Sequence, residues 1–77
     1  MTRHDWVTWD ETDRDRLARA CSAVLDDPDD FLQDDFDKAS AFAERLDEHG
    51  PAARFYPSTM TWLKRIEQRI ETLESAA

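Results

Sequence analysis

Residues 26–37 read Asp26-Asp27-Pro28-Asp29-Asp30-Phe31-Leu32-Gln33-Asp34-Asp35-Phe36-Asp37 and separate two segments with helical periodicity. Seven of these twelve residues are aspartates, and none of them is basic. Pro28 disfavours helical geometry in the residue before it, so a preceding helix should end near Asp26. We therefore expect a helix on each side of this acidic segment, with a short helical turn near Pro28.

The helix before the acidic segment is predicted over residues 9–26. Thr8 and Glu11 have the spacing of a capping box, with Thr8 as the N-cap. Apolar residues recur at helical intervals in the second half of this predicted helix: Leu17, Ala20, Cys21, Val24 and Leu25.

The helix after it is predicted over residues 34–49. Asp34 or Asp35 would cap its start, because aspartate is favoured at the N-cap position. Gly50 and Pro51 then form a typical helix stop.

A third helix is predicted over residues 58–76, with Ser58 as its N-cap. An apolar seam with alternating spacings of three and four residues runs along it: Leu63, Ile66, Ile70 and Leu73. Two interpretations of this seam stay open. It packs inside the fold, or it associates with a second copy of the chain in a homodimer.

These patterns predict an all-α fold, a small three-helix bundle that forms a single helical domain over residues 1–77. Phe55 and Trp62 are expected in its core. For Trp6 and Trp9 we favour packing of the N-terminal arm on the bundle over an exposed anchor for a partner.

The net charge of −8 is unevenly distributed along the chain. Residues 1–50 carry −9, whereas residues 51–77 carry +1. An acidic surface repels phosphates, so direct binding of nucleic acid is not expected. A regulator of the helix-turn-helix type, reading DNA with Lys64, Arg65 and Arg69, is the third of our functional hypotheses.

Few residues have the chemistry of a metal site or of a nucleophile. His4, Cys21 and His49 lack the paired spacing of zinc ligands, and the acidic segment lacks the glycine and glutamate of a calcium loop. Cys21 lies on an apolar stripe and is expected in the core. No Gly-rich phosphate loop is present. We therefore predict no metal, no cofactor and no enzymatic activity.

No apolar run approaches the length of a membrane span, and residues 1–6 do not resemble a signal peptide. A single cysteine cannot form an intramolecular disulfide. A cytoplasmic protein without membrane contact is the expectation.

The leading functional hypothesis is a non-enzymatic module that binds the basic surface of a partner protein. In size and charge only, the chain is similar to small inhibitors of nucleic-acid machinery, such as anti-CRISPR or anti-restriction proteins. The competing interpretation is a solvated linker with charged helix starts, and the alternative function is a structural or assembly subunit of a helical complex. The predicted partner-binding residues are Asp26, Asp27, Asp29, Asp30, Phe31, Asp34, Asp35 and Asp37.

Overall fold

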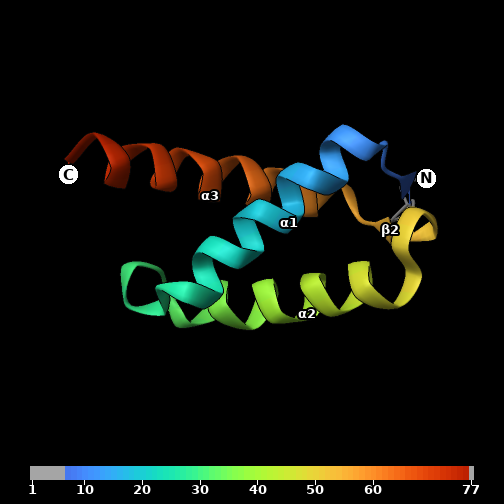
Figure 1. The fold of residues 1–77 in the computed structure, drawn as a ribbon, viewed down its shortest axis with the longest axis horizontal. Coiled ribbons are helices and arrows are strands. Elements are labelled where there is room, and N and C mark those ends of the chain that lie inside the picture. Colours follow the sequence, from blue (N-terminus) through green and yellow to red (C-terminus); the bar gives the residue numbers. More distant parts are fainter. Residues whose placement is uncertain (1–6, 77) are drawn as a thin grey trace, which may run out of the picture.

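A computed structural model describes residues 7–76 of the chain. Three long helices dominate it, which confirms the predicted all-α helical bundle (Figure 1). The 3-10 turn near Pro28 is also present. In chain order the elements are β1 (Val7–Thr8), α1 (Glu11–Asp26), η1 (Pro28–Asp30), α2 (Gln33–His49), η2 (Gly50–Ala52), β2 (Arg54–Phe55) and α3 (Pro57–Ala76).

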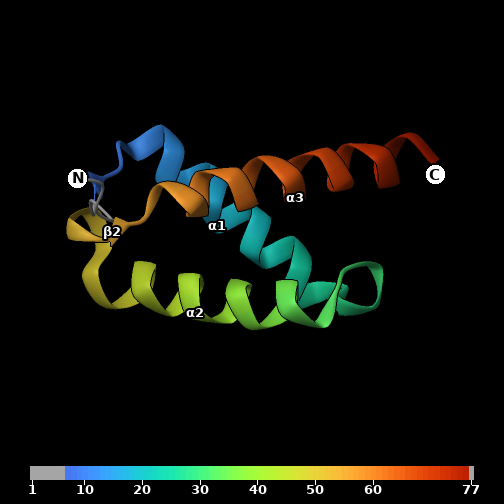
Figure 2. The same cartoon turned by 180° about the vertical axis from the view of Figure 1, so that it is seen from behind.

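The first helix holds the bundle together. In Figures 1 and 2, α2 and α3 run in opposite directions, and α1 crosses diagonally between them. Helix α1 contacts both of the other helices. The C-terminal end of α3 extends beyond the turn that joins α1 to α2 (Figure 1). This arrangement leaves the last turns of α3 beside the acidic segment.

A short antiparallel strand pair, which the sequence did not predict, joins the segments that precede α1 and α3. Val7 lies opposite Phe55, and Thr8 lies opposite Arg54. The prediction of Thr8 as N-cap is therefore wrong, because Thr8 belongs to β1. Helix α1 begins at Glu11, and its N-cap is Asp10, whose carboxylate accepts a hydrogen bond from the Asp13 N–H at 2.8 Å.

The predicted cap of the second helix is also corrected. Leu32 occupies the N-cap position, so Asp34 and Asp35 lie inside the first turn of α2. The Asp35 carboxylate instead reaches back and accepts a hydrogen bond from the Leu32 N–H at 3.3 Å. The predicted stop is present: α2 ends at His49, and Gly50 has a φ of +53°, a conformation that favours glycine.

Helix α3 begins at Pro57, a favoured first position, so Ser58 lies within the helix and is not its N-cap. The Thr59 N–H donates to the Tyr56 carbonyl at 2.9 Å. Residues 50–56, which join α2 to α3, contain both a 3-10 turn and strand β2. This connection differs from the three- or four-residue turn of a helix-turn-helix motif.

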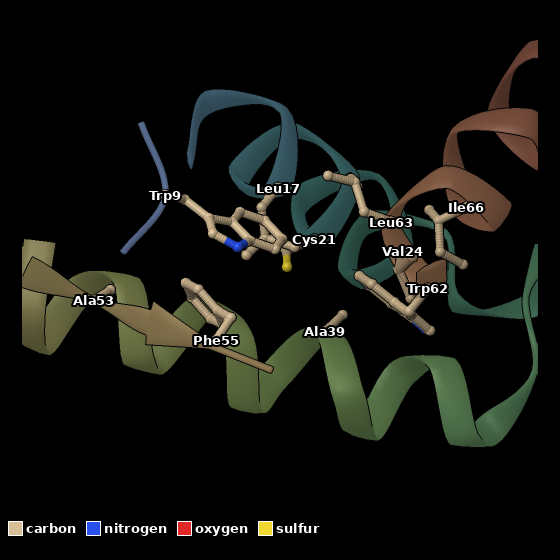
Figure 3. Close-up of a cluster of buried hydrophobic side chains, with 11 residues drawn as sticks. Trp9, Leu17, Cys21, Val24, Ala39, Ala53, Phe55, Trp62, Leu63 and Ile66 are labelled. Atoms are coloured by element: carbon tan, nitrogen blue, oxygen red, sulfur yellow. The ribbon is translucent and has the colours of Figure 1, made fainter. Parts of the chain in front are cut away.

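The core lies where α1 meets the other elements (Figure 3). The Trp9 and Phe55 rings are 4.9 Å apart between centroids, and the Phe42 and Trp62 rings are 5.1 Å apart. The expected core positions of Trp9, Phe55, Trp62 and Cys21 are confirmed, whereas Trp6 lies outside the described residues. The buried apolar residues are Trp9, Leu17, Ala20, Cys21, Val24, Ala39, Ala53, Phe55, Trp62, Leu63 and Ile66.

Candidate functional site

One member of the predicted binding surface has a structural role. Asp35 is only 1% exposed, so its carboxylate cannot present its charge to a partner. It accepts hydrogen bonds from the Trp62 indole Nε1 at 3.1 Å and from both terminal nitrogens of Arg65. The assignment of Asp35 to a partner-binding surface is therefore corrected: this carboxylate connects α2 to α3.

The environment of Asp35 acts on its ionisation in two opposite ways. Burial disfavours the charged carboxylate, but the hydrogen bonds from Arg65, Trp62 and Leu32 outweigh burial and lower the pKa of Asp35. The same contact raises the pKa of Arg65. Asp35 is therefore ionised at neutral pH, and its negative charge is compensated within the fold.

The other aspartates of the acidic segment are exposed. They lie on η1 and on the helix ends that flank it. Asp34 forms an exposed ion pair with Lys38 at 2.9 Å, and Asp37 accepts a hydrogen bond from Gln33. Among residues 7–76, the side chains of Asp26, Asp27, Asp29 and Asp30 make no hydrogen bond or ion pair; the contact of Asp30 with Arg69 uses its backbone carbonyl. These four carboxylates are the uncompensated part of the segment.

The apolar seam of α3 divides into two parts. Leu63 and Ile66 are fully buried in the core, so they cannot take part in the self-association that the sequence left open. Ile70 and Leu73 are half-buried and lie one and two turns further along the helix. The seam thus leaves the core and continues onto the surface.

The exposed continuation of the seam meets the acidic segment in a groove of about 340 Å³. Its floor is apolar, made by Ala23, Phe31, Ile70 and Leu73. The ionisable residues that line it in the described part of the chain are all acidic: Asp27, Asp30 and Glu74. Two sets of residues that the sequence singled out separately therefore lie in one place, which we call the acidic groove.

A neighbouring hollow shares Asp30 and Phe31 with the acidic groove but differs in charge. It is also lined by Arg65 and Arg69, and the Arg69 guanidinium donates to the Asp30 carbonyl at 3.2 Å. Opposite charges are mixed there, so this hollow does not select a cation. The described lining of the acidic groove, by contrast, carries charges of one sign.

The position of Asp26 and Asp27 at the end of α1 is unfavourable for the helix itself. A helix C-terminus carries partial negative charge, which disfavours carboxylates by roughly 0.3–1 kcal/mol each. Basic residues are absent from the last turn of α1. The helix dipole therefore explains the aspartates in the first turn of α2 but not these two.

Metal and nucleophile chemistry find no support among residues 7–76. No group of three or more His, Cys, Asp or Glu side chains there is arranged to hold a metal ion. Cys21 is buried in the core, and burial raises the pKa of its thiol to about 12, so the thiol is neutral at physiological pH. In the same part of the chain no helix is long and apolar enough to cross a bilayer.

Sequence reasoning missed Glu74 as a residue of the site and missed the structural role of Asp35. The proximity of Asp27 to Glu74 depends on how α3 crosses α1, and no local pattern encodes that crossing. No protein-family model, curated protein or solved structure matches the chain, so the geometry of the acidic groove is the basis for a functional assignment.

Proposed function

We propose that the chain is a binding module whose acidic groove receives a basic, amphipathic segment of a partner protein. The carrying observation is the composition of the groove, an apolar floor whose ionisable lining residues within the range 7–76 are all carboxylates. Apolar side chains of the segment pack on Phe31, Ile70 and Leu73. Its lysines or arginines meet the surrounding carboxylates.

The two components of the groove contribute differently to binding. Burial of apolar surface supplies affinity at roughly 25 cal/mol per Å². Exposed ion pairs contribute only about 0–1 kcal/mol each, but complementary charge accelerates association and selects the partner. A purely apolar ligand and a purely basic ligand would each lack one of these components.

Self-association is the alternative that the half-buried Ile70 and Leu73 favour. In a symmetric dimer the same patch meets itself, which would bring Asp27, Asp30 and Glu74 of both copies together. Like charges at such short range oppose association. A basic partner neutralises these carboxylates, so we prefer it to a second copy of the chain.

The test is a binding measurement with two designed peptides of equal length. One is a fluorescently labelled helix of lysine and leucine, and the other carries glutamate in place of lysine. Titration of the whole chain should raise the anisotropy of the lysine peptide only. The affinity should fall as salt is raised, because exposed ion pairs are screened.

Variants locate the site. Asp27→Asn combined with Asp30→Asn should weaken binding of the lysine peptide about fivefold at low salt. Asp15→Asn combined with Asp47→Asn removes the same charge from exposed positions outside the groove and serves as the control. Equal affinities of the two double variants would show that only net charge matters and would refute the proposal.

A further inference from the structure

The acidic groove continues along α1 and α3 beyond the residues described so far. A hollow of about 260 Å³ adjoins it and shares Ile70 and Glu74 with it. On the α1 side, the residues that line the two hollows follow one another at helical spacing: Arg16, Arg19, Ala20, Ala23 and Asp27. Residues 16–27 span about 16 Å of helix. The two hollows therefore form one groove between α1 and α3, which we call the extended groove.

An ion pair joins the two helices at one end of the extended groove. The Arg16 guanidinium of α1 donates to both carboxylate oxygens of Glu67 on α3, at 2.9 and 2.6 Å. Beyond this pair, α1 and α3 diverge toward their C-terminal ends (Figures 1 and 2). The extended groove is therefore a wedge that widens from the ion pair toward the acidic segment.

Negative charge predominates along the whole of the extended groove. The charges of Arg16 and Glu67 compensate each other. Arg19 is the other basic residue in the described lining of the narrow end, and Glu71 and Glu74 outnumber it there. The carboxylates of the acidic groove add to this charge at the wide end. A basic ligand is thus favoured along the full length of the wedge.

The backbone of the groove walls favours a helical ligand over an extended one. Most of the lining belongs to α1 and α3, whose N–H and C=O groups bond within each helix. An extended segment laid between them would find no backbone partners, unlike a segment that adds to the edge of a sheet. The paired strands β1 and β2 lie at the other end of the bundle (Figure 1). A helix brings its own backbone hydrogen bonds with it.

The spacing of the wall side chains favours the same conformation. Side chains on one face of α1 or α3 recur about every 5.4 Å, once per turn. One face of a helical ligand has the same repeat, whereas one face of a strand repeats about every 6.6 Å. Ala20 and Ala23 line the groove from α1, and their small side chains allow another helix to approach closely.

We propose that the partner segment binds as an amphipathic α-helix that lies along the extended groove between α1 and α3. Its apolar stripe packs on Ala23, Ile70 and Leu73. Its basic side chains meet Glu71 at the narrow end as well as the carboxylates of the acidic groove. This inference rests on the proposed function, and it adds the helical conformation of the ligand and the participation of Glu71.

The first experiment compares two labelled peptides with the same lysine and leucine composition. Both have about 14 residues, enough to span the groove as a helix. One places leucines three and four residues apart, and the other alternates leucine with lysine. Titrated with the whole chain at concentrations at which each peptide is monomeric, the first should bind at least about tenfold more tightly. Its circular dichroism should gain helical signal on binding.

The outcomes separate this inference from the proposed function. Equal affinities of the two peptides, or tighter binding of the alternating one, would overturn the helical ligand and leave a basic segment in the acidic groove. Absence of binding by both peptides would refute the proposed function and this inference together.

A matched pair of variants tests the narrow end. Glu71→Gln should weaken binding of the helical peptide about threefold at low salt, because one exposed ion pair is lost. Glu44→Gln removes the same charge from an exposed position on α2, outside the lining of the extended groove, and should change the affinity less than about 1.5-fold. Equal effects of the two variants would overturn the participation of Glu71, whatever the effect of substitutions at Asp27 and Asp30.

Discussion

The Trp62 indole Nε1 donates a hydrogen bond to the Asp35 carboxylate at 3.1 Å, and both side chains are at least 95% buried. This contact joins the start of α2 to the first turns of α3 across a gap of 27 residues in the sequence. Arg65 binds the same carboxylate from the solvent side. Two residues of α3 thus supply three hydrogen-bond donors to one buried charge, and the Leu32 N–H at the start of α2 supplies a fourth.

Asp35→Ala is expected to destabilise the fold by about 2–4 kcal/mol, because it leaves the Trp62 and Leu32 N–H groups without their acceptor. Urea denaturation of the variant measures this loss. Asp34→Ala is the matched control, since Asp34 is exposed and its ion pair with Lys38 contributes about 0–1 kcal/mol. A similar loss in both variants would argue against the buried network.

Stability should depend on pH through Asp35. The pKa of this carboxyl is lower in the folded protein than its ordinary value of about 3.9, so its contribution is complete above that value. The contribution disappears as pH falls through the lower, folded pKa. The difference in unfolding free energy between the parent and Asp35→Asn should therefore shrink below about pH 4. A difference that stays constant down to pH 2.5 would contradict this account.

Along the seam of α3, substitution of a fully buried residue should lower the free energy of unfolding more than substitution of a half-buried one. Ile66→Ala should cost about 2–5 kcal/mol, because Ile66 is fully buried. Leu73→Ala should cost less than about 1.5 kcal/mol, because Leu73 is half-buried at the edge of the acidic groove. Thermal or urea unfolding of the two variants measures these costs. Equal losses of stability would mean that Leu73 belongs to the core.

Removal of the negative charges at the C-terminal end of α1 should not lower the stability of the fold. Asp26→Asn combined with Asp27→Asn removes negative charge from a helix C-terminus and should stabilise the fold by about 0.5–1.5 kcal/mol. Glu11→Gln, at the favourable N-terminal end of the same helix, should instead destabilise it slightly. Destabilisation by the aspartate substitutions would give these residues a structural role and remove one argument for a functional one.

The three helices could be predicted because each carries its own periodic pattern and the first two are followed by a stop signal. Pro28, Gly50 and Pro51 end helices through backbone geometry that depends only on neighbouring residues. The helix starts were less predictable. Two aspartates were candidates for the cap of α2, and neither occupies it. At α1 the choice of Asp10 over Thr8 depends on the pairing of Thr8 with Arg54, a contact distant in sequence.

The candidate site was predicted only in its parts. The acidic segment and the α3 seam are both visible in the sequence, but their meeting at Phe31, Ile70 and Leu73 depends on helix crossing. Asp35 shows the limit most clearly. It lies beside exposed Asp34 in the same acidic segment, and only the facing Trp62 and Arg65 distinguish a structural carboxylate from a surface one.

The most direct test of the central claim is NMR mapping of where the lysine–leucine peptide binds. Amide resonances of the whole chain are followed as the peptide is added. The account predicts shifts concentrated at residues 23–31 and 70–74, the two segments that line the acidic groove. Shifts confined to residues 45–54, or spread evenly along all exposed acidic positions, would contradict it.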